Sequence, residues 1–259
     1  MNNYFDLTRF VNLFKKHLSE NLKLYLMSLI VLGGILILFF CYLSYMTPVN
    51  LAFPNVQFVI YFPTFLLSGC IFSSIGFSGL GDKKNAIAAL LLPSSKIEKF
   101  LVPWIYVFIL FPIFFTALFY ALDALFLFSL NPKDDKRIEF YNVFSPEGNR
   151  HLVFIVYLLL ASVAFLGAIL FEKIHFIKIA AIFFVFAFCF LWLNTFFLSY
   201  LTTWGIGPSM PFSGLRFDYE NNNVALNVDN DIAYMVGTVC TIAPLLWLST
   251  YLKLKEKEV

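Results

Sequence analysis

A run of 58 consecutive residues, 24–81, contains no charged side chain, and most of these residues are large and apolar. A helix of that length would reach ~87 Å at ~1.5 Å per residue, whereas the apolar core of a bilayer is ~30 Å thick and is crossed by ~20 residues. The run must therefore cross a membrane, turn and cross back. The turn falls at residues 47–50, which include Pro48 and Asn50.

The composition of the whole chain agrees with a polytopic membrane protein. Of the 259 residues, 60% are hydrophobic and 13% are charged, and the mean hydropathy is +0.81. A soluble domain carries about 25% charged residues. The net charge of +2 and the dispersed basic residues argue against a nucleic-acid partner. The four cysteines lie in apolar runs without a C-x-x-C pair, and we expect them to be buried small side chains.

Charge gaps divide the chain into six apolar spans, which predict an all-α fold in a single transmembrane domain of residues 1–259. The predicted spans are 24–45, 58–77, 101–130, 152–171, 179–200 and 232–252. With the N-terminus inside, 13 of the 18 Lys and Arg residues lie on the inner side and 5 on the outer side. The positive-inside rule therefore predicts that both termini are cytoplasmic.

The segment before the first span, residues 6–22, has an amphipathic helical pattern. Its apolar residues recur at helical spacing on one face, and its basic residues lie away from that face. Such a helix lies in the membrane interface, where basic residues favour anionic lipid. The alternative is that this segment simply extends the first span.

Residues 79–100 predict a helical hairpin on the cytoplasmic face. Its first helix ends at Pro93, because proline cannot continue a helix. Ser95 and Glu98 have the spacing of a capping box that begins a second helix. That helix runs into the third span, where Pro103 can bend it.

Residues 201–231 form the longest outer segment. Glycine and proline between residues 204 and 211 break any helix there. Residues 215–219 then alternate in polarity, Asn221 to Asn223 supply turn residues, and 224–226 are apolar. This pattern predicts a small β-hairpin outside the membrane.

Two polar residues fall inside predicted spans. Asp123 is near the outer end of the long third span, so we expect it at the interface or in a hydrogen bond within the bundle. Asn194 in the fifth span is expected to join helices.

The sequence carries no signature of catalysis, metal binding or cofactor binding. It contains no P-loop and no H-E-x-x-H motif, so we expect no bound nucleotide, no catalytic residue and no metal. Residues 76–79 read G-x-S-G, the form found in intramembrane serine proteases. Both His151 and His175 lie at span ends, which argues against a serine–histidine couple.

The stretch Leu90 to Leu101, with a leucine-rich part, a proline, two serines, a lysine and the start of span three, resembles permease subunits of ABC-2 type transporters. The six-span layout with a preceding amphipathic segment is also similar. The chain departs from the family pattern at Lys96, where arginine is common, and lacks the Gly-Lys that usually follows. In that family the loop between spans two and three contacts the ATPase subunit.

This resemblance implies a permease subunit of an ATP-driven exporter in the bacterial cytoplasmic membrane. It implies a homo- or heterodimer of permease subunits with separate nucleotide-binding ATPase subunits. The implied docking residues of the coupling loop are Leu91, Pro93, Ser95, Lys96, Ile97 and Glu98.

Two other classes of function remain open. One is a membrane scaffold or sensor that uses the outer segment 201–231. The other is a polytopic enzyme, which the lack of paired acids or His/Ser couples in the spans disfavours. The loop 79–100 separates the first two classes, because only a transport subunit needs this loop to dock on an ATPase.

Overall fold

The computed structural model describes residues 6–46, 54–76, 95–129, 142–145, 150–170, 175–201, 215–219, 222–226 and 231–257. Apart from one two-stranded hairpin and a short turn at 142–145, the described chain is helical. Its long helices are α1 (Leu7–Met46), α2 (Pro54–Ile75), α6 (Phe111–Ser129), α7 (Leu152–Leu170), α8 (His175–Leu201) and α9 (Asp231–Lys257). A short helix, α5 (Lys96–Ile105), and a π-helical segment, η2 (Tyr106–Leu110), precede α6 without a break.

Within the described residues, five apolar helices are long enough to cross a membrane. They correspond to the predicted spans one, two, three, four and six, with ends that differ from the prediction by a few residues except at the start of α1. The fifth predicted span coincides with α8, whose described apolar part is Phe188–Tyr200. The chain is therefore built as a multi-pass membrane protein.

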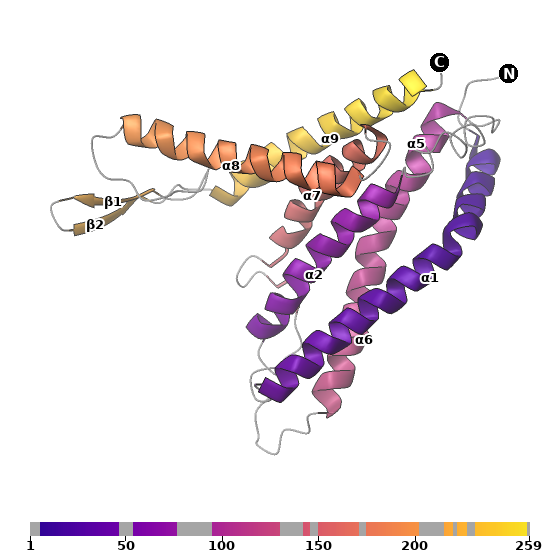
Figure 1. The fold of residues 1–259 in the computed structure, drawn as a ribbon, viewed down its shortest axis with the longest axis horizontal. Coiled ribbons are helices and arrows are strands. Elements are labelled where there is room, and N and C mark those ends of the chain that lie inside the picture. Colours follow the sequence, from indigo (N-terminus) through magenta and orange to yellow (C-terminus); the bar gives the residue numbers. More distant parts are fainter. Residues whose placement is uncertain are drawn as a thin grey trace.

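α1 is one continuous helix of 40 residues, so the segment 6–22 is not a separate element. The alternative that it extends the first span is the one found. At ~1.5 Å per residue α1 is ~60 Å long, about twice the apolar thickness of a bilayer. The helix changes direction along its length (Figure 1), so the part beyond the bilayer does not simply prolong the membrane-spanning part.

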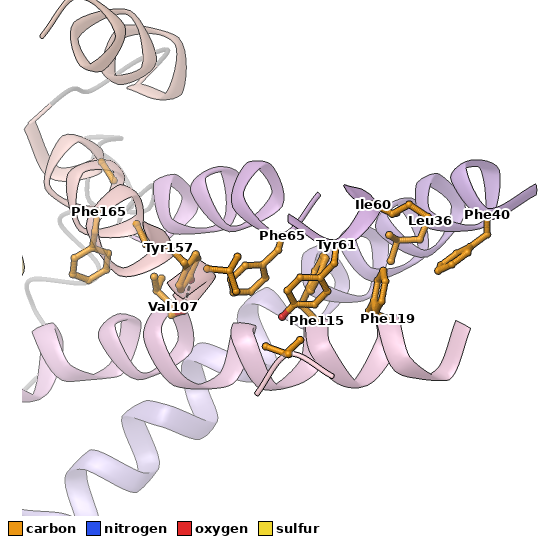
Figure 2. Close-up of a cluster of buried hydrophobic side chains, with 14 of the residues drawn as sticks. Leu36, Phe40, Ile60, Tyr61, Phe65, Val107, Phe115, Phe119, Tyr157 and Phe165 are labelled. Carbon is orange, nitrogen blue, oxygen red and sulfur yellow. Dashed lines mark hydrogen bonds between the residues drawn. The ribbon is translucent and has the colours of Figure 1, made fainter. Parts of the chain in front are cut away.

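The core lies between α1, α2, α6 and α7 and is rich in aromatic rings. Tyr61 and Phe65 of α2 face Phe115 and Phe119 of α6, with ring centroids 5.0–5.5 Å apart. Figure 2 shows these rings in a row between the two helices, with Phe40 of α1 at one end of the row. Aromatic pairs at these separations stabilise packing beyond the area that they bury.

α7 is the central helix of the other half and packs against α2, α8 and α9. Its buried face includes the small residues Ala161, Ala164 and Ala168, which let neighbouring helices approach closely. Trp247 of α9 donates an indole hydrogen bond of 2.9 Å to Ser162 of α7. This bond fixes the position of α9 on α7.

α8 extends away from the other helices, and the hairpin lies beyond its far end (Figure 1). Phe188, Trp192, Phe196 and Tyr200 recur every four residues on α8, and each is more than half exposed. A stripe of this kind needs lipid or another helix to cover it.

Strand β1 (Leu215–Tyr219) pairs antiparallel with β2 (Asn222–Leu226), with Leu215 opposite Leu226 and Tyr219 opposite Asn222. The predicted hairpin is therefore confirmed at the level of the backbone. The cysteines are free, and Cys41, Cys189 and Cys240 are exposed on helix surfaces. The expectation that all four are buried is wrong for these three, because a uniformly apolar helix gives no sign of which face meets lipid.

The start of α1, the start of α5 and the end of α9 converge at one end of the molecule (Figure 1). The convergence is held by contacts between α1 and α5 and by a ring contact of 5.8 Å between Phe100 of α5 and Tyr251 of α9. The first and last helices thus begin and end on the same side, as an even number of membrane crossings requires.

Candidate functional site

The predicted capping box at the start of α5 is confirmed. Ser95 is the N-cap, with extended backbone angles (φ −69°, ψ 153°), and its hydroxyl accepts a hydrogen bond of 3.3 Å from the amide of Glu98. The Glu98 Oε2 atom accepts a bond of 3.0 Å from the Ser95 amide. The two residues thus satisfy amides that the first turn of a helix leaves without partners.

Glu98 also caps α1, which the sequence did not reveal. Its Oε1 atom accepts a hydrogen bond of 2.9 Å from the backbone amide of Asp6, 92 residues away in sequence. Arg9 Nη2 lies 3.8 Å from the same oxygen. Asp6 in turn caps its own helix, since its Oδ1 atom accepts from the Thr8 amide at 2.9 Å. One carboxylate therefore joins the N-termini of two helices.

Burial makes this junction energetically important. The Glu98 side chain is fully buried, and an isolated buried carboxylate is very unfavourable. Here two amides donate to it, two helix N-termini direct their positive ends toward it, and Arg9 supplies a positive charge. Removal of this carboxylate would take the hydrogen-bond acceptor from both amides and the negative charge from beside Arg9.

The residues predicted to dock an ATPase subunit are not equivalent in the structure. Ile97 is 47% exposed, beside the buried Glu98. Lys96 and Ser95 are half-buried. Leu91 and Pro93 lie outside the described residues. Ile97 is therefore available to a partner, whereas Glu98 is buried and holds α1 against α5.

Below the junction, α1 packs against η2 through an aromatic cluster. The Phe14 and Tyr106 rings stack with centroids 4.7 Å apart, and the His17 ring lies 4.9 Å from the Tyr106 ring. Tyr25 contacts both Tyr106 and Phe72 of α2, at 5.7 and 5.4 Å. The cluster extends from the Glu98 junction along α1 as far as Tyr25, so α1 is attached to the third span over several turns.

The π-helical segment η2 has a cause in the sequence. The Phe111 amide bonds to the carbonyl of Tyr106, five residues back. In the same pattern the next amide would bond to the carbonyl of Val107, but residue 112 is proline and has no amide hydrogen. The phenol of Tyr157 on α7 fills this place, donating to the Val107 carbonyl at 2.7 Å (Figure 2). π-Helical turns mark positions where a helix can change direction.

Gly69 of α2 makes room for Tyr157. A Cβ atom at residue 69 would lie 2.3 Å from Cε2 of the Tyr157 ring, well inside contact distance. The bond to Val107 therefore depends on a glycine in the facing helix.

The two intramembrane polar residues lie in different surroundings. Asp123 on α6 is fully buried, and neither of its carboxylate oxygens has a hydrogen-bond partner in the described part of the chain. Among the described residues, neither the expected interface exposure nor the expected hydrogen bond is found, because the side chain is buried where α6 meets α1 and α2. Asn194 is half-buried on α8.

Among the described residues, no three histidine, cysteine or acidic side chains are grouped so that they could hold a metal ion. Comparison with known proteins gives no matching family model, no similar curated protein and no similar solved structure. The exposed Ile97 is thus connected to the first helix through Glu98 and to the third span through α5 and η2, so a displacement at Ile97 would reach both.

Proposed function

We propose that this chain is the membrane-spanning permease subunit of an ATP-driven transporter of the ABC-2 type, an exporter whose ATPase is a separate subunit. The observation that carries the proposal is the Glu98 junction, which ties the first helix to the helix that leads into the third span. The permease subunits would pair as a homo- or heterodimer in the bacterial cytoplasmic membrane, with both termini inside.

Two routes lead from the exposed Ile97 into the membrane. The first runs through Glu98 to Asp6 and Arg9, and so to α1. The second runs along the unbroken helical path of α5, η2 and α6. A push on this surface would thus move the first and third spans together, and coordinated movement of packed helices is one way to produce alternating access.

A second candidate function is a membrane scaffold or sensor that uses residues 201–231. The specific observation in its favour is the β1–β2 hairpin, which lies beyond the far end of α8 and away from the helix bundle (Figure 1). A sensor would bind its partner through this outer segment, with no need of a partner at Ile97.

Site-specific crosslinking in cells distinguishes the two functions. A photo-reactive amino acid at Ile97 should capture a P-loop ATPase, which mass spectrometry would identify. The matched control is Phe144, which is 71% exposed in the turn between α6 and α7 and should capture no ATPase. Ile97→Asp should also abolish co-purification of that ATPase, because a charge in a desolvated contact costs several kcal/mol. If Ile97 captures no ATPase while positions in 215–226 capture another protein, the scaffold function is correct.

A further inference from the structure

Asp123 lies in the half of the bundle away from the two chain ends, which is the outer half in the proposed topology, on the face of α6 that contacts α1 and α2. Phe119 and Phe126, one turn before and after it, both pack against Phe40 of α1, with ring centroids 5.6 and 5.2 Å apart. These aromatic rings lie on both sides of Asp123 along the helix. The carboxyl group is fully buried, and neither oxygen has a hydrogen-bond partner among the residues described.

The facing position on α2 is occupied by an uncharged polar side chain. The helices are antiparallel, and Tyr61 packs on Phe119 while Phe65 packs on Phe115. One turn further out, the same register brings Gln57 opposite Asp123, and Gln57 is also fully buried. An amide group can both donate to and accept from a carboxyl group, but it cannot neutralise a negative charge.

Among the described residues of α1, α2 and α6, no cation faces Asp123. α1 carries no charged residue beyond Lys23. Tyr61 of α2 bonds to Thr116, and Tyr120 of α6 accepts from the Val143 amide. At the outer ends of α2 and α7, the Arg150 guanidinium donates to Asn55 at 3.1 Å. Within the part of the chain that the structure describes, an ionised Asp123 would thus be a buried charge without compensation, which costs several kcal/mol.

We propose that Asp123 is a reversible proton-binding site in the outer half of the bundle. In the closed arrangement of α1, α2 and α6 the carboxyl group is neutral and carries its proton. When these helices separate and water enters, the proton passes to water and the carboxylate is hydrated. Proton occupancy is thereby linked to whether the outer half of the bundle is closed. This inference does not depend on the identity of the cytoplasmic partner.

Infrared difference spectroscopy of the full chain in lipid nanodiscs tests the proposal. At neutral pH the wild type should show the carbonyl band of a protonated carboxylic acid, which Asp123→Asn should lose. Titration to alkaline pH should remove the band, and return to neutral pH should restore it. Absence of the band at neutral pH would show an ionised Asp123 and overturn the proposal. Should Asp123→Asn fail to fold, Asp123→Glu serves instead, and the band must shift in frequency.

Thermal unfolding gives a second readout of the same site. Raising the pH favours the ionised form, which the closed bundle does not accommodate, so the Tm of the wild type should fall with rising pH. The neutral side chain of Asp123→Asn cannot ionise. The Tm of Asp123→Asn should therefore rise relative to the Tm of the wild type as the pH increases. A difference that is constant with pH would contradict the proposal.

Discussion

The phenol of Tyr157 donates a 2.7 Å hydrogen bond to the backbone carbonyl of Val107, fifty residues earlier in the chain. The π-helical bond from Phe111 to Tyr106 spans five residues, so the next residue, Pro112, would have to donate to the Val107 carbonyl. Pro112 has no amide hydrogen and leaves this carbonyl without a backbone donor. A side chain of α7 thus completes the backbone bonding of the third span. The bond holds together the helix that leads inward from the Glu98 junction.

We expect Tyr157→Phe to destabilise the protein by about 1–3 kcal/mol, because a buried carbonyl would lose its partner. The measurement is the free energy of unfolding in bicelles. A matched control is Tyr200→Phe, since Tyr200 is 81% exposed on α8 and its hydroxyl should contribute little.

A double-mutant cycle tests the role of Pro112. Pro112→Ala restores an amide that can bond within the helix, so Tyr157→Phe should cost less in the Pro112→Ala background than in the wild type. Equal costs in both backgrounds would mean that the tyrosine does not substitute for the missing amide.

Gly69→Ala should destabilise the bundle by about 1–3 kcal/mol, because the new methyl group would collide with the Tyr157 ring. Gly34→Ala is the matched control. Its Cβ would meet nothing within 4 Å, and alanine favours a helix over glycine by ~0.5–1 kcal/mol. The two substitutions should therefore shift the Tm in opposite directions, and a similar shift for both would contradict the packing of Gly69 on Tyr157.

Much of this fold could be predicted, since charge gaps and local spacing determine it. The gaps locate the spans, because a charged side chain is costly in a bilayer. The spacing of Ser95 and Glu98 predicts the cap of α5, and residues 215–226 predict the hairpin. A single continuous α1 could also have been predicted in place of a separate interfacial helix, because no glycine or proline interrupts residues 7–32.

The missed features depend on contacts between distant segments. The bond from Asp6 to Glu98 joins residues 92 positions apart, and no local sequence pattern predicts it. The burial of Asp123 depends on which face of α6 meets α1 and α2, a choice that an apolar span does not encode locally. Pro112 was a visible signal for η2, but its partner Tyr157 follows only from the packing of α7 on α2.

Glu98→Ala should cost more than the ~0.5–2 kcal/mol of a single lost cap, because this carboxylate caps two helices. We expect about 2–4 kcal/mol, because the ion pair with the partly exposed Arg9 is lost as well. Unfolding free energies would measure this. Glu256→Ala is the control, since its bond to Lys253 is exposed and should contribute under about 1 kcal/mol. An equal cost for both variants would mean that Glu98 does not join α1 to α5.

Three residues in the N-terminal part of α1 should lie in three different surroundings. Phe14 packs on Tyr106, Lys16 is exposed, and Leu18 is exposed although apolar. Spin labels in proteoliposomes should therefore be immobilised at Phe14, accessible to a water-soluble relaxation agent at Lys16, and accessible to oxygen at Leu18. Water access at Leu18 equal to that at Lys16 would show that this part of α1 projects into solvent rather than lying along the membrane surface.

The two ends of the chain should lie on the same side of the membrane. The start of α1 and the end of α9 both lie beside α5, and the excess of basic residues on that side predicts that it is cytoplasmic. A reporter active only in the cytoplasm should work when fused after Leu252, and a reporter active only outside should work when inserted near Asn149. An external C-terminal reporter would require an odd number of crossings, so α8 would then not span the membrane. An intact cytoplasmic signal after Leu252 requires α8 to cross together with the five other apolar helices.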